Sequence, residues 1–439
     1  MTDYSPVIQK GPATVAEERR ERAVLVGVDR PGLEWPLDSS LAELERLADT
    51  AGADTVAVTT QKLDAPNPRT FVGTGKAEEI AELARAHEAD LVIFDDELTP
   101  SQQANLEKVM DKSVKVIDRT ALILDIFALH ATSKEGRLQV RLAQNQYLYP
   151  RLRGMWAHLA SNRMGGGVGS RFGEGESQLE VDRRMVRKRI TTIRRELAHL
   201  ADVRSLQRES RYGSGMFKVA LAGYTNAGKS SLLNRLTGSD VLSYDKLFAT
   251  LDSTTRKFEL PEGREVTATD TVGFIQKLPT TLVDAFKSTL DEITGADLIL
   301  HVIDASSPEF ESQADAVHDV LDQIGAHSIA TLDVFNKCDL LDEETLAGLR
   351  RRYPHALFVS ARTGQGTDAL IDALSQAASA SDEKLTVLVP YQRGDLVSLA
   401  HERCHLISEE HRADGTLMQM LASPAFASAF APFVVEDEA

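Results

Sequence analysis

Gly223-Tyr-Thr-Asn-Ala-Gly228-Lys229-Ser230 is the most informative motif in the chain. It follows the apolar run 217–222, which predicts a short buried strand, and it precedes 231–236, whose leucines recur at helical spacing. A strand, the pattern G-x-x-x-x-G-K-S and a helix in this order predict a phosphate-binding loop, because the glycines leave backbone N–H groups free to face phosphate oxygens. We expect Lys229 to reach the β- and γ-phosphates and the Ser230 hydroxyl to ligate Mg²⁺. The alternative, a glycine-rich turn without a chemical role, does not account for the strand predicted before the motif and the helix predicted after it.

Two later motifs indicate which base is bound. Asn336-Lys337-Cys338-Asp339 follows a predicted strand at 331–335. The Asp339 carboxylate can accept two hydrogen bonds from the N1–H and N2–H₂ groups of guanine, whereas adenine offers no such donor pair. Ser360-Ala361-Arg362 follows another predicted strand, 356–359, and is suited to backbone contacts with guanine O6. Each motif alone is weak, but this order after a phosphate loop favours a guanine nucleotide.

Asp270-Thr271-Val272-Gly273 lies between these motifs, after a predicted strand at 265–269. Asp270 is suited to hold Mg²⁺ through a water molecule, and the Gly273 N–H to meet the γ-phosphate. The next residue is Phe274, where Ras-type enzymes carry the glutamine that orients the attacking water. We therefore expect slow intrinsic hydrolysis, with the water positioned by another group, by potassium or by a docked partner.

The segment 248–256 lies where the first nucleotide-sensing switch belongs. A threonine there should complete the Mg²⁺ shell when the γ-phosphate is present. The residues alone leave three candidates, Thr250, Thr254 and Thr255.

Composition sets further limits. The chain has 439 residues, a formal net charge of −17 and two cysteines, Cys338 and Cys404, without metal-ligand spacing. We expect a reducing compartment, no disulfide and no zinc site. No apolar stretch is long enough for a membrane span and the N-terminus has no signal-peptide pattern, so the expected location is cytoplasmic, including the membrane periphery.

The N-terminal part alternates predicted strands and helices. After a disordered lead-in at 1–20, this predicts a small α/β domain over 21–118. Gly73-Thr-Gly75-Lys76 within it resembles a phosphate loop, but Thr70 stands where the first glycine is needed and Ala77 replaces the Mg²⁺ hydroxyl. A glycine turn that caps a helix and could contact RNA phosphate is favoured, and a second nucleotide site stays open.

Residues 119–212 predict an antiparallel helical hairpin. Leu138, Leu142, Gln146 and Leu152 suggest one helix broken near Pro150. The second helix has apolar residues at steps of four, three, four and three, a heptad seam: Val186, Ile190, Ile193, Leu197 and Leu200. Its other faces are rich in arginine, and the loop from 153 to 175 mixes glycine, arginine and aromatic residues.

A basic helix in an acidic chain favours phosphate contact over a merely solvated face. The loop can fold against irregular RNA, and its alternative is a flexible linker. The candidate RNA-binding residues are Trp156, Arg163, Arg171, Arg187, Lys188 and Arg194.

Taken together, these motifs resemble the HflX family of ribosome-associated, translation-factor-type GTPases. The resemblance also includes 118–127, 137–144, Gly165-Gly-Gly167 and 178–184. It implies a cytosolic GTPase whose partner is the large ribosomal subunit with its rRNA, acting in ribosome splitting, rescue or recycling under stress. It favours Thr250 over Thr254 as the Mg²⁺ threonine, and it implies that the hairpin loop reaches toward the peptidyl-transferase centre.

The predicted fold class is α/β multidomain. A small N-terminal α/β domain and the hairpin are followed by a P-loop GTPase (G) domain over 213–378, with a mostly parallel sheet and helices on both faces, and by a small C-terminal α+β module over 384–439. The predicted cofactors are GTP and Mg²⁺, and the predicted catalytic residues are Lys229, Thr250, Asp270 and Gly273. Ser230 and Thr250 are the predicted metal ligands. The predicted nucleotide-binding residues are Gly223, Tyr224, Thr225, Asn226, Ala227, Gly228, Lys229, Ser230, Ser231, Phe248, Ala249, Thr250, Leu251, Asp252, Asp270, Thr271, Val272, Gly273, Asn336, Lys337, Cys338, Asp339, Ser360, Ala361 and Arg362.

Two rivals stay open. One is a nucleotide-switched module that regulates a non-ribosomal protein or membrane partner, which the acidic net charge supports. The other is an ATPase that acts on RNA. We expect no DNA partner, no stable membrane insertion and a monomer away from the ribosome.

Overall fold

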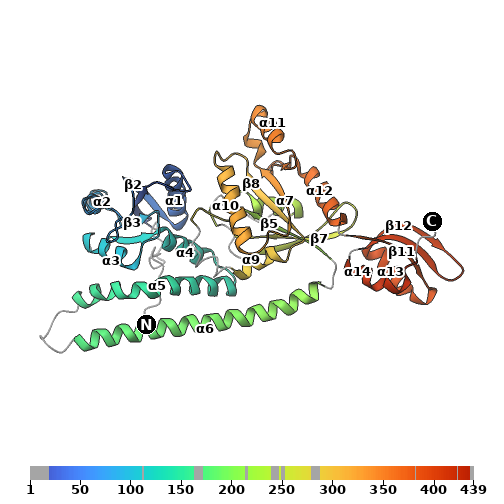
Figure 1. The fold of residues 1–439 in the computed structure, drawn as a ribbon, viewed down its shortest axis with the longest axis horizontal. Helices are drawn as coiled ribbons and strands as arrows, with labels where there is room; N and C mark the ends of the chain where they lie inside the picture. Colours follow the sequence, from blue (N-terminus) through green and yellow to red (C-terminus); the bar gives the residue numbers. More distant parts are fainter. Residues whose placement is uncertain are drawn as a thin grey trace.

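The computed structural model describes residues 19–110, 113–162, 172–212, 216–238, 247–248, 253–277, 287–380, 382–422 and 424–435. Figure 1 shows an elongated molecule with the N-terminal domain at one end, the G domain beside it and the C-terminal module at the other end. Two long helices run below the N-terminal domain, and the second continues toward the G domain. The predicted multidomain α/β fold is confirmed. The lead-in predicted for 1–20 lies almost entirely outside the described residues.

The N-terminal domain is a parallel sheet covered on both faces. Its strand order is β2-β1-β3-β4, and all neighbours are parallel. Ala23 and Leu25 of β1 point into the core under α1 and α4, whereas Val24 and Val26 point into the core under α2. The elements are β1 (Glu21–Asp29), α1 (Leu37–Ala51), β2 (Ala53–Lys62), α2 (Thr74–Ala86), β3 (Leu91–Phe94), α3 (Pro100–Val109), β4 (Lys115–Asp118) and α4 (Arg119–His130).

The helical hairpin consists of α5 (Lys134–Asn162) and α6 (Phe172–Tyr212), which pack side by side (Figure 1). The predicted break near Pro150 is wrong, because α5 continues through this proline. Proline removes one helical hydrogen bond, but Arg151 just beyond it is buried and donates to the Leu98 carbonyl at 2.6 Å, which fixes the helix against the N-terminal domain. Trp156 therefore lies on α5 and not in a loop.

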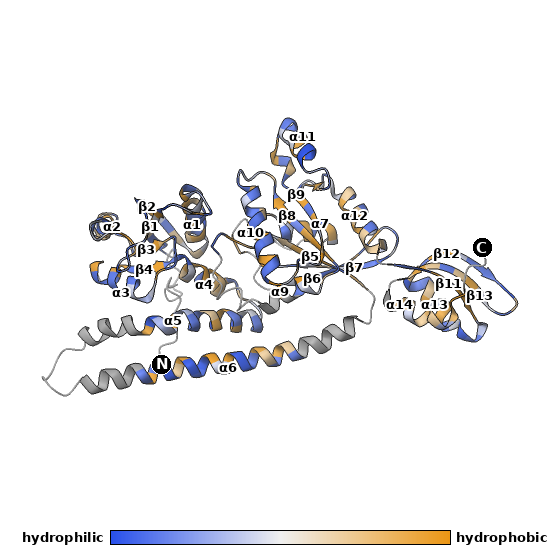
Figure 2. Ribbon diagram, viewed as in Figure 1, coloured by the Kyte–Doolittle hydropathy of each residue, from blue (hydrophilic) through white to orange (hydrophobic). Residues whose placement is uncertain are grey.

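The predicted seam of α6 is confirmed by burial. Val186 is buried, and the remaining seam residues at 190, 193, 197 and 200 are half-buried while most residues between them are exposed. Figure 2 shows this mixture of apolar and hydrophilic positions along α6.

The G domain has a six-stranded sheet in the order β10-β9-β8-β5-β7-β6. All neighbours are parallel except β6, which runs antiparallel to β7 at the edge. Figure 2 shows apolar residues gathered in the central strands. The strands are β5 (Phe217–Gly223), β6 (Thr254–Glu259), β7 (Glu265–Asp270), β8 (Leu298–Asp304), β9 (Ala330–Asn336) and β10 (Leu357–Phe358), and the helices are α7 (Lys229–Thr237), α9 (Lys287–Thr294), α10 (Phe310–Gln323), α11 (Glu343–Arg352) and α12 (Thr367–Ala380).

The C-terminal module is an antiparallel sheet in the order β11-β13-β12, with helices on one side. Helix α12 ends at Ala380 and β11 begins at Glu383, one residue before the predicted start of the module at 384. No helix in the described ranges is both long and apolar enough to cross a membrane. The elements are β11 (Glu383–Val389), α13 (Gly394–Arg403), β12 (His405–His411), β13 (Thr416–Ala422) and α14 (Pro424–Phe430).

Candidate nucleotide-binding site

The predicted phosphate loop joins β5 to α7 at the carboxyl edge of the sheet. Gly228 has φ 92°, in the left-handed region that favours glycine, and a Cβ there would lie 2.2 Å from Asn336 Nδ2. A Cβ on Gly223 would lie 2.3 Å from the Val302 carbonyl oxygen on β8. Both glycines are therefore required by close packing, and they bring the loop against two neighbouring strands.

Lys229 lies folded inside this loop. Its ammonium donates to the Gly223 and Tyr224 carbonyls at 3.0 and 2.9 Å. Burial lowers the pKa of Lys229 to about 8, and the nearby Asp270 carboxylate offsets only part of that effect. A phosphate group would supply the negative charge that this buried cation needs.

The Asp270 motif faces the loop from the end of β7. The Ser230 hydroxyl donates to Asp270 Oδ2 at 2.5 Å, so the two predicted Mg²⁺-associated groups are adjacent. A Cβ on Gly273 would lie 2.8 Å from Thr225 Cα and 3.0 Å from Lys229 Nζ. Only glycine fits at this position, and its backbone lies against the lysine that would contact the terminal phosphates.

Phe274 is part of the structure that holds the loop. Its carbonyl accepts from the Thr225 N–H at 2.7 Å, and its own N–H donates to the Gly223 carbonyl at 3.2 Å. The Phe274 side chain is buried in the core shared with the N-terminal domain. It does not replace the missing glutamine.

The first switch is described only in part. Phe248 is buried, whereas Ala249, Thr250, Leu251 and Asp252 lie outside the described residues. Thr254 opens strand β6 opposite Asp270, and the Thr255 hydroxyl lies 2.9 Å from that of Thr269 on β7. Thr255 is thus engaged in the sheet, which weakens it as a Mg²⁺ candidate.

The predicted base-binding motifs meet at the ends of β9 and β10. Asn336 donates to the Ala227 carbonyl at 2.9 Å and accepts from the Ala361 N–H at 3.0 Å, so it ties the phosphate loop to both motifs. Asp339 accepts from the Ser360 hydroxyl at 2.6 Å and pairs with the exposed Arg362 at 2.8 Å. The hydrogen bond from Ser360, together with Arg362, lowers the pKa of Asp339, which keeps it a carboxylate.

The other predicted residues of this site have supporting positions. Lys337 has φ 64° and its ammonium pairs with Asp304 at 2.7 Å. Cys338 is buried, and burial raises its pKa to about 11. The Thr271 hydroxyl donates to the Leu221 carbonyl at 2.7 Å. Asn226 has φ 61° in the loop, Ser231 is half-buried on α7, and Val272 and Ala361 are buried.

A buried polar network that sequence patterns do not predict joins this site to the N-terminal domain. The Tyr224 hydroxyl donates to Glu43 of α1 and accepts from the Gln276 N–H at 2.6 Å. Glu43 also accepts from Arg119 of α4, and Glu43, Arg119 and Gln276 are each at most 2% exposed. Burial raises the pKa of Glu43 although Arg119 opposes the shift.

A second branch of the network begins at Lys277, which follows the Asp270 motif. Its ammonium contacts Asp95 and Asp96 at the end of β3. Burial alone would raise the pKa of Asp95, but Arg119 and Lys277 outweigh it and the pKa lies below its ordinary range. In the first switch, the ring of Phe248 packs edge to face on the Phe127 ring of α4, with the centroids 4.5 Å apart. The first switch and the segment from Asp270 to Lys277 therefore both contact the N-terminal domain.

The basic helix α6 is exposed. Arg187, Lys188 and Arg194 face solvent, and none of them forms an ion pair within the part of the chain that the structure describes. Arg187 stacks over the Tyr149 ring at 5.5 Å and donates to its hydroxyl, which orients it without neutralising it. Arg163 and Arg171 lie outside the described residues, and so does the side chain of Trp156.

A phosphate loop, an Asp-x-x-Gly motif and an Asn-Lys-x-Asp motif at one edge of a mostly parallel sheet define a P-loop GTPase. Family models agree along the chain. Residues 38–128 match the GTP-binding GTPase N-terminal domain, 130–211 the GTP-binding GTPase middle region, and 218–337 the 50S ribosome-binding GTPase domain.

Curated relatives extend the match. GTPase HflX of Caldanaerobacter subterraneus is 47% identical over 397 residues, which is 90% of each chain. GTPase HflX of Escherichia coli is 43% identical over 386 residues, 88% of this chain and 89% of the relative. GTPase HflX of Alkalihalophilus pseudofirmus is 50% identical over 73% of this chain and 74% of the relative. The chain belongs to the HflX family of GTPases.

Proposed function

We propose that this GTPase, in its GTP-bound state, binds the large ribosomal subunit and that GTP hydrolysis releases it. The N-terminal domain and the basic helix α6 would contact rRNA, and the complex would act in ribosome splitting, rescue or recycling under stress in the cytoplasm. The observation that carries this proposal is the exposed cationic face of α6 in a chain whose net charge is −17. Uncompensated surface cations that lie along one helix are suited to release counterions from a nucleic-acid backbone.

The site residues would act as follows when GTP is bound. Lys229 would exchange its two carbonyl contacts for phosphate oxygens, and the Gly273 N–H would meet the terminal phosphate. Asp339 would accept from the guanine edge, and Asn336 would keep the base-binding loops in register with the phosphate loop. The same carboxylate would lie unpaired against adenine, which disfavours an ATPase.

The donor set at the phosphate end fits Mg²⁺. Ser230 and Asp270 supply hard oxygen atoms 2.5 Å apart, and a hydroxyl–carboxylate pair at a phosphate site suits this ion. Ser230 would ligate it directly, Asp270 through water, and Thr250 would complete the shell. When bound, Mg²⁺ neutralises charge that develops on the phosphates.

Hydrolysis would be slow in the free protein and faster on the ribosome. Phe274 is buried and its backbone is bonded to the phosphate loop, so it cannot orient a water molecule. The group that positions the attacking water molecule would come from a partner or from a rearranged switch. Release of the terminal phosphate would loosen the two segments to which Phe248, Gln276 and Lys277 belong. Since these residues contact α4, α1 and the end of β3, respectively, the N-terminal domain would be held differently.

Binding to purified large subunits tests the proposal. Wild-type protein should co-sediment with a non-hydrolysable GTP analogue and not with GDP. A variant with Arg187, Lys188 and Arg194 changed to glutamate should bind more weakly, and the slope of log K against log[salt] should fall by about 2 because three phosphate contacts are lost.

The matched control reverses three exposed arginines at the end of α11, Arg350, Arg351 and Arg352, which changes the net charge equally. Both variants should bind GTP as the wild type does. If the two variants bind large subunits equally well, α6 is not the rRNA contact and a non-ribosomal partner becomes the better explanation.

A further inference from the structure

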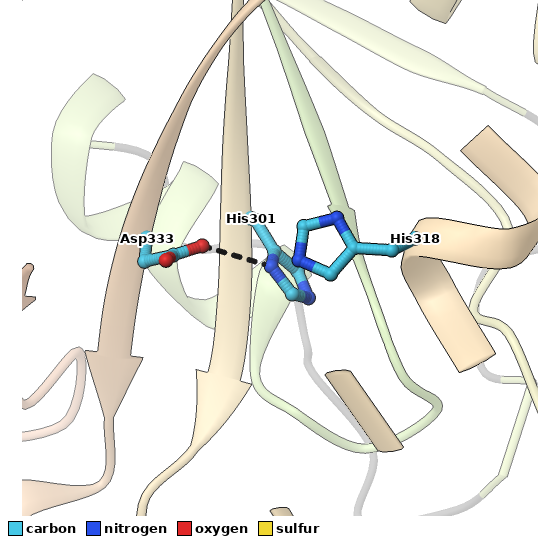
Figure 3. Close-up of side chains that lie close together, drawn as sticks. All are labelled: His301, His318 and Asp333. Carbon is cyan, nitrogen blue, oxygen red and sulfur yellow. Dashed lines mark hydrogen bonds and ion pairs between the residues drawn. The ribbon is translucent and has the colours of Figure 1, made fainter. Parts of the chain in front are cut away.

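Three side chains of the G domain that do not belong to the predicted nucleotide-binding set lie close together on the α10 side of the sheet. His301 lies on β8 and Asp333 on β9, at paired positions of two parallel strands. His318 reaches them from α10 (Figure 3). The sequence pattern gives no sign of this group, because 17 and 15 residues separate its members along the chain.

The group has the composition of a transition-metal site. Two imidazoles and one carboxylate suit Zn²⁺ and similar divalent ions, and a site with three protein ligands leaves one position for water. One ligand atom of each residue can be chosen so that all three lie within 4.8 Å of one another. Since two ligands of a tetrahedral ion with bonds of about 2.0 Å lie about 3.3 Å apart, closure needs only a small approach of side chains.

His318 is the residue whose side chain can move toward the other two ligands. His301 Nδ1 lies 3.0 Å from Asp333 Oδ1, already close to the spacing that a shared ion requires (Figure 3). The ring centroids of His301 and His318 are 4.8 Å apart. His318 is exposed on a helix surface, so a change of its rotamer can bring a ring nitrogen to the ion, whereas His301 is 1% exposed and fixed by its strand.

The protonation states also suit metal binding. Burial lowers the pKa of His301, although its hydrogen bond to Asp333 opposes this, so the ring is neutral at physiological pH. The same hydrogen bond lowers the pKa of Asp333, which is therefore ionised. Neutral imidazole and carboxylate are the forms that ligate metals. The partial exposure of Asp333 and His318 gives an ion a path from solvent.

We propose that His301, His318 and Asp333 form a binding site for one divalent transition-metal ion, Zn²⁺ in the first place, with water as the fourth ligand. The ion would bind His301 Nδ1 and Asp333 Oδ1 in place of their hydrogen bond, with the single ring proton of His301 moved to Nε2 so that the imidazole stays neutral. It would fasten α10 to β8 and β9. This site differs in kind from the Ser230–Asp270 pair, whose oxygen donors suit Mg²⁺. The earlier expectation of no zinc site concerned the two cysteines, and neither of them takes part here.

Co²⁺ titration of the full chain tests the site. The protein is freed of nucleotide and of any purification tag and treated with a chelator, so that Co²⁺ cannot enter with a bound nucleotide. The wild type should bind one Co²⁺ with the visible absorption of a nitrogen- and oxygen-ligated ion, and one equivalent of Zn²⁺ should abolish that absorption. Zn²⁺ should also raise the Tm, because an ion that binds only the folded state stabilises it.

Variants at the exposed ligands locate the ion. His318→Ala and Asp333→Asn should each weaken Co²⁺ binding at least tenfold, which corresponds to about 1.4 kcal/mol. His327→Ala, at an exposed histidine just after α10, is the matched control and should bind as the wild type does. Circular dichroism and GTP binding confirm that each variant is folded.

The site is refuted if the wild type shows no ligand-field absorption, or if His318→Ala and Asp333→Asn bind Co²⁺ as tightly as His327→Ala. In that case the His301–Asp333 pair is only a contact between strands. A Zn-edge anomalous difference map of a wild-type crystal is an independent test. A peak among the three side chains supports the site, and a peak only elsewhere refutes it.

Discussion

The Tyr224 hydroxyl is the point at which the phosphate loop, the residues after the Asp270 motif and the N-terminal domain meet. It donates to the Glu43 carboxylate and accepts from the Gln276 N–H at 2.6 Å, and both partners are 1% exposed. Tyr224→Phe removes one hydrogen bond to a charged group and leaves a buried N–H without its acceptor. Each loss costs about 1–3 kcal/mol, and since Glu43 keeps Arg119, we expect the interface to weaken by about 2–4 kcal/mol in total.

Amide hydrogen exchange measures this change directly. When opening is fast and reversible, a loss of about 2–4 kcal/mol accelerates exchange by about 30- to 900-fold in the segments that open. Residues 271–277 and helix α1 should show the acceleration. Tyr391→Phe is the matched control, since that hydroxyl donates to the Arg412 carbonyl in the C-terminal module at 2.7 Å. Exchange at 271–277 within twofold of the wild type would refute the role given to Tyr224.

Three further predictions concern the nucleotide site. Because the pKa of Lys229 is lowered to about 8 in the free protein and bound phosphates would raise it, GTP binding should take up nearly one proton at pH 9 and almost none at pH 6.5–7. The affinity for GTP should therefore fall as the pH rises through 8. Titration calorimetry in buffers of different ionisation enthalpy measures the proton uptake, and equal binding heats in these buffers at pH 9 would contradict it. Asp339→Asn should weaken GTP binding at least about a hundredfold through loss of two charge-assisted hydrogen bonds and should favour xanthosine triphosphate, as competition against a fluorescent nucleotide would show; an unchanged preference for GTP would place the base elsewhere. Gly228→Ala should abolish nucleotide binding, since its Cβ would meet Asn336 Nδ2 at 2.2 Å, whereas Gly348→Ala, which meets nothing within 4 Å, should bind normally.

Local patterns were sufficient for the G domain and for the placement of its motifs. The loop 223–230 could be predicted because glycine spacing, lysine and flanking hydrophobicity all point to one structure. The ends of β5, β7 and β9 then follow, since parallel strands bring their carboxyl ends to one edge. Strand β6 was missed because its residues, Thr254–Glu259, carry little apolar alternation and its pairing with β7 is a long-range property.

Tertiary contacts decided the features that the sequence did not predict. Pro150 reads as a helix breaker, yet contacts of Arg151 with the N-terminal domain carry α5 through it. Arg119 lies within a stretch typical of the family, but nothing local shows that it pairs with Glu43 and Asp95 in a buried network against the phosphate loop. The same holds for His301, His318 and Asp333, which only the packing of α10 on the sheet brings together.

If the proposed function is right, nucleotide hydrolysis is coupled to the large ribosomal subunit. Single-turnover hydrolysis of radiolabelled GTP, with and without purified large subunits, measures this coupling. Large subunits should accelerate the wild type about tenfold or more, and the variant reversed at Arg187, Lys188 and Arg194 should lose most of that acceleration at equal GTP occupancy. Equal rates with and without subunits would contradict the coupling.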